Sequence, residues 1–66
     1  MQVTINGERK EIGKQLTISG LIAELGIDPT LVAVEQNGEI VPKSIHANTP
    51  VTEGDTLELV RFIGGG

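Results

Sequence analysis

Polar and apolar residues alternate over residues 2 to 5, a pattern typical of a strand with one buried face. Asn6-Gly7 follows, a dipeptide that tolerates the positive φ angles of a tight hairpin turn. The next segment, residues 8 to 14, is mostly charged, and Ile12 is its one clearly inward residue. Gly13 is a candidate bulge position. This pattern predicts a hairpin whose second strand is an edge strand protected by charge.

A helical spacing follows this hairpin. Four apolar residues recur at i, i+3, i+4 and i+7 and so share one helix face: Ile18, Leu21, Ile22 and Leu25. Thr17 is the predicted N-cap, with Ser19 as the alternative. Gly26 is expected to end the helix in a left-handed conformation, with Ile27 folding back on Ile22. Because so short a helix is unstable alone in water, we expect it to pack against a sheet.

The second half of the chain returns to strand and turn patterns. Residues 31 to 36 are the next predicted strand, Asn37-Gly38 is a second tight turn, and residues 39 to 42 return briefly. Residues 44 to 49 have no clear period. Residues 50 to 55 are predicted to be a loop that leads into the last strand.

The last predicted strand covers residues 56 to 63. A helix between an early hairpin and later strands permits the first and last strands to lie parallel at the sheet centre. The inward residues of these two strands would be Val3, Ile5, Leu57 and Leu59. The predicted fold class is α+β, a β-grasp or ubiquitin-like arrangement with a mixed sheet of four to five strands and one short helix packed across it. Residues 1 to 63 would form the single domain, and residues 64 to 66 a flexible glycine tail.

Composition narrows the classes of function. The 66 residues have a formal net charge of −4 and scattered basic residues, so we expect no binding to nucleic acid. Phe62, the single aromatic residue, provides no platform on which successive bases would stack. The chain has no cysteine, and its longest apolar run, residues 31 to 34, is far shorter than the roughly 20 residues of a membrane span. We expect a soluble, cytoplasmic protein that binds no membrane.

Familiar catalytic and metal sites have little support in this sequence. A Ser-His-acid triad would depend on the single His46 with Ser19 or Ser44, in a domain too small to enclose a substrate. A metal site would have only this histidine and dispersed carboxylates as ligands, so none is predicted. His46 itself is interpreted as a surface residue or as a hydrogen-bonding residue of a turn.

The glycine run after the last strand is the first feature that could take part in chemistry. Gly64, Gly65 and Gly66 have no side chains, and three extended residues reach about 10 Å beyond a folded body. A carboxylate on Gly66 can therefore be threaded through a narrow channel into the active site of another protein. A frayed or artificial tail is the alternative, and composition alone does not separate the two.

The outer side of the last strand is the second such feature. If the leucines of that strand point inward, Glu58, Val60 and Phe62 point to the opposite side of the sheet. Val60 and Phe62 would then form an exposed apolar pair beside the tail, widened by Leu31 and Ala33. The alternative is a bent sheet in which Phe62 or the residue after it enters the core. An exposed apolar patch of this kind would mark a surface for a partner protein.

Taken together, these residues resemble a known family, the ubiquitin-like ThiS sulfur carriers of bacterial thiamine biosynthesis. The resemblance runs from end to end of the chain. It rests on the Asn6-Gly7 turn, residues 31 to 34, residues 37 to 44, Glu53-Gly54-Asp55 and residues 59 to 66.

The resemblance implies a protein carrier that is not itself an enzyme. An adenylating enzyme would use ATP and Mg²⁺ to convert the Gly66 carboxylate to an acyl-adenylate. Persulfide sulfur relayed from a cysteine desulfurase would displace AMP, and a thiazole synthase would receive sulfur from the resulting thiocarboxylate. Gly64 and Gly65 match the tail motif of the family, and Val60 and Phe62 correspond to its docking surface by position. The free carrier would be a monomer with no bound cofactor.

Three alternatives remain at this point. The small subunit of molybdopterin synthase has the same fold and tail chemistry in another pathway. A sulfur carrier for cysteine synthesis or tRNA thiolation is a second possibility. A passive β-grasp interaction module, in which the apolar face does the binding and the glycines only add flexibility, is an alternative of a different class. Deletion of the tail separates the last alternative from the others, because a passive module would keep its binding.

Overall fold

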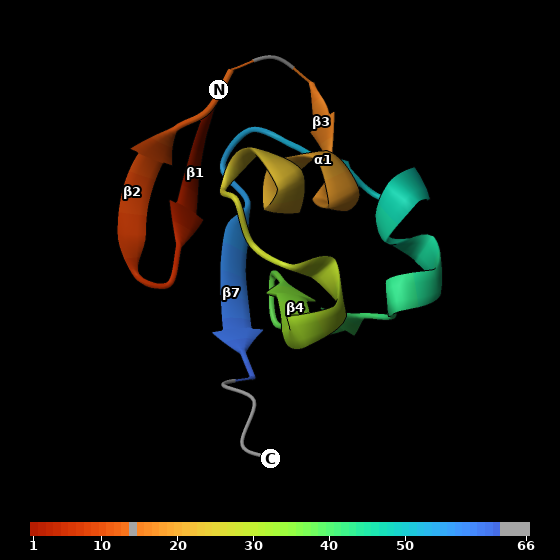
Figure 1. The fold of residues 1–66 in the computed structure, drawn as a ribbon. Helices are drawn as coiled ribbons and strands as arrows, with labels where there is room; N and C mark the ends of the chain where they lie inside the picture. The colour runs from red at the N-terminus through yellow and green to blue at the C-terminus, as the bar shows by residue number, and fades with distance from the viewer. Residues whose placement is uncertain (14, 63–66) are drawn as a thin grey trace.

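A five-stranded mixed sheet with one helix across it forms the body of the protein (Figure 1). The computed structural model describes residues 1 to 13 and 15 to 62. In spatial order the strands are β2 (Glu8–Glu11), β1 (Gln2–Ile5), β7 (Thr56–Arg61), β4 (Val32–Gln36) and β5 (Glu39–Val41). Helix α1 (Ile18–Glu24) covers one face of this sheet.

The first and last strands are central and parallel, as the sequence pattern predicted. Ile5 of β1 lies opposite Leu57 of β7, whereas every other neighbouring pair in this sheet is antiparallel. The chain crosses over the sheet through α1, which is what a parallel pair requires. The α+β class and the β-grasp arrangement are confirmed.

Both predicted signals at the ends of α1 are confirmed. The Thr17 side-chain oxygen accepts a hydrogen bond from the Gly20 N–H at 3.1 Å, so Thr17 rather than Ser19 is the N-cap. Gly26 adopts a φ of +71°, and the Ile27 N–H donates to the Ile22 carbonyl at 3.1 Å. This closure satisfies a carbonyl that the helix end would otherwise leave without a partner.

The core lies between α1 and the sheet. The four residues predicted to point inward from β1 and β7 are all buried, and so is Ile12, the inward residue expected after the charged strand. The remaining buried apolar residues come from the helix and the later strands: Ile18, Leu21, Ile22, Val32, Val34, Val41 and Val51. Burial of these side chains holds a helix too short to be stable by itself.

Several boundaries differ from the sequence prediction. A separate two-stranded ribbon pairs β3 (Leu16–Thr17) with β6 (Pro50–Val51). Strand β6 lies in the segment predicted to be a loop, and no strand was predicted at β3. Leu31 ends a 3-10 turn, η1 (Pro29–Leu31), so β4 starts one residue later than predicted. Strand β2 ends at Glu11, and Gly13 therefore lies outside the sheet and is not a bulge. Short pairings of two residues give no periodic signal, which is why the ribbon was missed.

A second 3-10 helix, η2 (Lys43–Asn48), occupies the segment that showed no period. It turns His46 inward, so the interpretation of His46 as a surface residue was wrong and its interpretation as a hydrogen-bonding residue was right. Only 4% of His46 is exposed, and its Nε2 lies 2.9 Å from the Val41 carbonyl oxygen. His46 thus joins η2 to the end of β5.

Candidate functional site

Strand β7 is the last element before the glycine run in the sequence, and both Asn-Gly turns fix the position of β7. Asn6, at the end of β1, receives a hydrogen bond from the Leu59 N–H at 2.7 Å and donates to the Leu59 carbonyl at 3.2 Å. Asn37, at the end of β4, accepts from the Thr56 N–H at 2.9 Å. One turn therefore holds the middle of β7 and the other holds its beginning.

Val60 and Phe62 are exposed, as the sequence predicted. Val60 is 57% exposed and Phe62 is 51% exposed, so the alternative in which Phe62 enters the core is wrong. The Phe62 N–H donates to the Leu31 carbonyl at 2.8 Å, which continues the pairing of β7 with β4 past Arg61. This bond keeps the Phe62 backbone beside η1, with its ring available to a partner.

The predicted widening of the apolar patch is also present, and it extends further than expected. Ala33 lies directly opposite Val60, and Leu31 is 42% exposed beside Phe62. Ile40 of β5 was missed, although it is 75% exposed. The alternation of Ile40 with the buried Val41 was the signal that could have identified it. We call Leu31, Ala33, Ile40, Val60 and Phe62 the outer patch.

Glu58 is exposed next to the outer patch, as predicted, and it faces another carboxylate. In the β4–β7 register Glu58 lies directly opposite Glu35, which is exposed as well. Ile40 lies on the other side of Glu35, in the β4–β5 register. The outer patch is thus bordered by two acidic side chains on adjacent strands.

Gly64, Gly65 and Gly66 lie outside the described residues, as does Ile63, the predicted end of the last strand. The last described residue is Phe62, which follows the end of β7 at Arg61. In the sequence, the glycine run begins two positions after Phe62 of the outer patch and ends at Gly66, four positions after it.

A buried carboxylate fixes the start of β7. Asp55 is 5% exposed and accepts hydrogen bonds from the Thr52 N–H at 2.8 Å and hydroxyl at 2.9 Å, from Asn37 at 3.0 Å and from Gln36 at 2.9 Å. Burial acts to raise the pKa of Asp55, but these four donors together outweigh it and hold the pKa below its ordinary value. The role of Asp55 is to join the loop before β7 to the β4–β5 turn.

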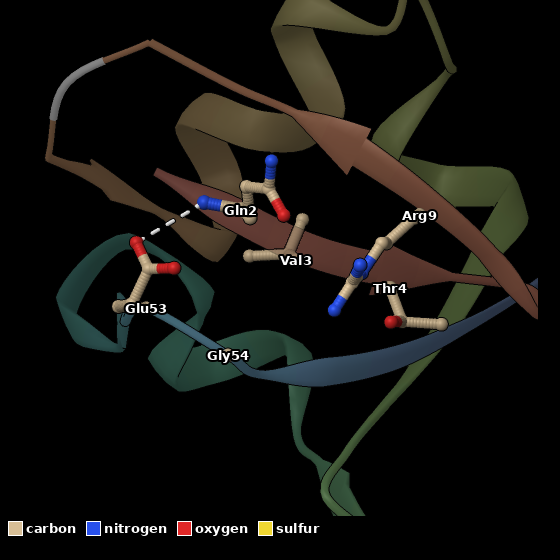
Figure 2. A pocket seen from close by; sticks show the side chains of 6 residues that line it. All are labelled: Gln2, Val3, Thr4, Arg9, Glu53 and Gly54. Atoms are coloured by element: carbon tan, nitrogen blue, oxygen red, sulfur yellow. Dashed lines mark hydrogen bonds between the residues drawn. The ribbon is translucent and has the colours of Figure 1, made fainter.

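A small polar hollow lies at the opposite end of β7 from Phe62 (Figure 2). Its volume is 130 Å³, below the roughly 300 Å³ at which pockets for small molecules begin. Gln2, Thr4 and Arg9 line it from β1 and β2, and a hydrogen bond of 3.1 Å from the Gln2 N–H to Glu53 crosses one end. Its size and polar lining do not suit an organic substrate.

The described residues also offer no cluster suited to a metal ion. Within residues 1 to 13 and 15 to 62, no three His, Asp or Glu side chains are grouped as potential ligands. In the same part of the chain, no helix is long and apolar enough to cross a membrane.

Comparison with known proteins assigns the family. The ThiS family matches residues 3 to 66, which includes the glycine run. A thiazole synthase of Paramagnetospirillum magneticum is 52% identical over all 66 residues, which make up 20% of that protein, and one of Magnetococcus marinus is 38% identical over the same share. The chain thus spans about a fifth of the length of these two curated relatives.

Two further relatives are of similar size to this chain. The sulfur carrier protein ThiS of Bacillus subtilis is 36% identical over 50 residues, 76% of each protein. The crystal structure of the thiamine biosynthesis protein ThiS from Geobacter metallireducens matches with a TM-score of 0.86 and 32% identity, over the full length of both chains. With a shared fold, a shared tail region and these relatives, the protein described here is a member of the ThiS family.

Proposed function

We propose that this protein carries sulfur for thiamine biosynthesis as a thiocarboxylate on Gly66. The observation that supports this most directly is that the family match extends through residue 66 and so includes Gly64, Gly65 and Gly66. The relative from Bacillus subtilis is a sulfur carrier, and the structural relative is a thiamine biosynthesis protein. The chain acts as a co-substrate of other enzymes.

Sulfur loading begins with activation of the terminal carboxylate. A carboxylate oxygen of Gly66 attacks the α-phosphate of ATP on an adenylating enzyme, and pyrophosphate leaves. Mg²⁺ belongs to that enzyme, where it offsets the phosphate charge. The resulting acyl-adenylate has AMP as a good leaving group, which the carboxylate itself lacks.

Sulfur then replaces the AMP. The terminal sulfur of a persulfide, supplied by a cysteine desulfurase, attacks the Gly66 carbonyl carbon and AMP departs. A second thiol cleaves the sulfur–sulfur bond of this acyl disulfide, so that a disulfide is formed elsewhere and a thiocarboxylate remains on Gly66. Because the chain has no cysteine, no internal thiol competes with the terminal sulfur.

The acceptor of the sulfur is a thiazole synthase. Two relatives contain a region matching the whole of this chain within proteins named thiazole synthase, so carrier and synthase occur there in one polypeptide. Joining the carrier region and the synthase region in one polypeptide raises the effective concentration of each for the other. Such a fusion is expected when the two proteins must bind each other. These relatives favour the thiazole pathway over that of molybdopterin. Val60, Phe62 and Glu58 are proposed to contact the partner enzymes.

The test is the intact mass of the 66-residue chain after incubation with ATP, Mg²⁺, the adenylating enzyme and a sulfur donor. We expect one oxygen to be exchanged for one sulfur. A chain lacking Gly66 is the control. Its terminal carboxylate is displaced by about 3.5 Å. This shift is enough to prevent the reaction, because reacting atoms must lie within roughly 3 to 3.5 Å of each other. Absence of the exchange with active enzymes, or equal loading of the shortened chain, would contradict the proposal and favour a passive interaction module.

A further inference from the structure

Both hairpin turns of the sheet consist of an asparagine followed by a glycine, Asn6-Gly7 and Asn37-Gly38. This dipeptide is the one most prone to spontaneous deamidation, because glycine has no side chain to shield its backbone nitrogen. That nitrogen attacks the side-chain carbonyl carbon of the asparagine, and ammonia leaves as a cyclic imide forms. Water then opens the imide to aspartate or isoaspartate, so that an –NH2 group is exchanged for –OH.

The fold fixes both asparagine side chains against β7. The Asn37 Oδ1 accepts a hydrogen bond from the Thr56 N–H at 2.9 Å, and its Nδ2 donates to Asp55 Oδ1 at 3.0 Å. The Asn6 side chain is likewise bonded at both ends, to the N–H and the carbonyl of Leu59. Cyclisation requires the side chain to turn toward the following glycine, so both of its bonds must first break. The rate of deamidation in the folded protein should therefore follow how often the turn opens.

The two turns differ in what the reaction product would face. Asn37 donates to the buried carboxylate of Asp55, whose four donors all come from uncharged groups. A carboxylate in place of the Asn37 amide would remove one donor and set a second negative charge beside the first, where like charges repel strongly. In the other turn, a carboxylate in place of the Asn6 amide would lose only the bond to the Leu59 carbonyl. It would still accept from the Leu59 N–H.

We propose that Asn37 is a site of spontaneous deamidation that the folded state protects, and that its product releases the start of β7. Asn37 belongs to two connections at this point, because it bonds Asp55 and also pairs with the Thr56 backbone. Aspartate at this position breaks the first connection by repulsion. Isoaspartate adds a carbon to the backbone of the tight turn and so disturbs the second as well. The modification needs neither a partner enzyme nor the sulfur chemistry proposed above.

Reaction at Asn37 should promote reaction at Asn6. A fold whose central strand β7 is weakened at its start opens more often, and an open turn is the form that cyclises. The reverse effect is smaller, because the product at Asn6 keeps its acceptor for the Leu59 N–H. The order of the two reactions is therefore set by the fold, although both turns have the same dipeptide. Asn37 thus limits the lifetime of the folded chain.

The first experiment follows deamidation of the full chain at mildly alkaline pH, folded and in guanidinium chloride, by mass spectrometry of tryptic peptides. Cleavage by trypsin places Asn6, Asn37 and Asn48 in different peptides. In denaturant we expect similar rates at Asn6 and Asn37 and a much lower rate at Asn48, which precedes a β-branched threonine. In the folded protein Asn37 should react at least about tenfold more slowly than in denaturant, because its hydrogen bonds must open first. Equal rates at Asn37 in the two conditions would overturn the proposal.

The second experiment compares N37D with N6D, a matched pair in which each variant adds one negative charge beside β7. In thermal unfolding followed by circular dichroism, N37D should unfold at least about 5 °C below N6D. Asn6 in folded N37D should deamidate faster than Asn6 in the wild type. Aged wild-type protein, separated by ion exchange into its deamidated forms, gives the same comparison without requiring a variant to fold. Equal stability of the two products, or an N37D protein as stable as the wild type, would overturn the proposal.

Discussion

Two asparagines have the same double role in this fold. Asn6 and Asn37 both adopt positive φ, +51° and +53°, which Asn tolerates better than most residues, and so each begins a tight turn. Each then uses its side-chain amide as a substitute for strand backbone beside β7. The first role is visible in the sequence, whereas the second depends on which strand the fold brings alongside.

We predict that Asn6→Gly lowers the free energy of unfolding by about 1 to 2 kcal/mol, since each of the two lost hydrogen bonds to Leu59 contributes about 0.5 to 1.5 kcal/mol net. Glycine keeps the positive φ, so the loss reports on the side chain rather than on the turn. Urea unfolding followed by far-ultraviolet circular dichroism is suitable, because the chain has no Trp or Tyr. Gly7→Ala, which strains the turn and keeps the amide, is the complementary control. Unchanged stability of the Asn6→Gly variant would refute the role assigned to this amide.

At the scale of elements, the sheet is assembled around β7, and the connections at its two ends differ in chemistry. Its beginning is fixed by a charged group, Asp55, with donors from the preceding loop and from the β4–β5 turn. Its far end is held by backbone pairing with β4 and by the bond from Phe62 to Leu31. The first connection depends on pH, and the second does not.

The lowered pKa of Asp55 predicts a specific acid dependence of stability. The unfolded chain binds this proton more readily than the folded chain does, so stabilisation by Asp55 is complete above the unfolded pKa, near pH 4. It is lost as the pH falls through the lower, folded pKa. We expect Asp55→Asn to be less stable by about 2 kcal/mol at pH 7, because buried donors lose their acceptor. The difference from wild type should shrink toward pH 2 in urea titrations, and a constant difference would contradict this account.

At the scale of the whole molecule, the described core and the residue proposed to carry the chemistry are separate along the sequence. The buried apolar residues lie between residues 3 and 59, whereas the proposed chemistry is at Gly66. A domain of this size has a small free energy of unfolding. Because the proposed chemistry is at Gly66, it requires no change in the residues of the core. In the proposed function, the folded body provides the surface for partner enzymes, and the outer patch is its main feature.

We predict that Gly65→Leu slows adenylation of Gly66 at least tenfold while leaving the thermal unfolding midpoint unchanged. A branched side chain next to the terminal residue would block a narrow channel that admits only glycine. Pyrophosphate release measures adenylation, and circular dichroism measures unfolding. Gly13→Leu is the matched control, since Gly13 is exposed and a Cβ there meets no atom within 4 Å. Equal rates for wild type and Gly65→Leu would argue against a narrow channel.

Much of the fold was predictable from local signals. The period of the apolar residues located β1, α1, β4 and β7, and the two Asn-Gly pairs located both hairpins. The exposure of Val60 and Phe62 followed from alternation along a strand whose inward residues were known. These features depend on backbone preferences and on burial of one face, both of which the order of residues specifies.

Other features were decided only by tertiary structure. The β3–β6 ribbon is too short to have a period, and His46 is buried because η2 packs it against the end of β5. The pairing of Glu35 with Glu58, which are 23 positions apart (58 − 35), depends on the register between β4 and β7. The sequence by itself determined β1, α1, β4, β7 and both hairpins, the glycine run and which residues of β7 face outward. Tertiary structure decided which distant groups meet, because register and packing join segments whose separation along the chain leaves no local pattern.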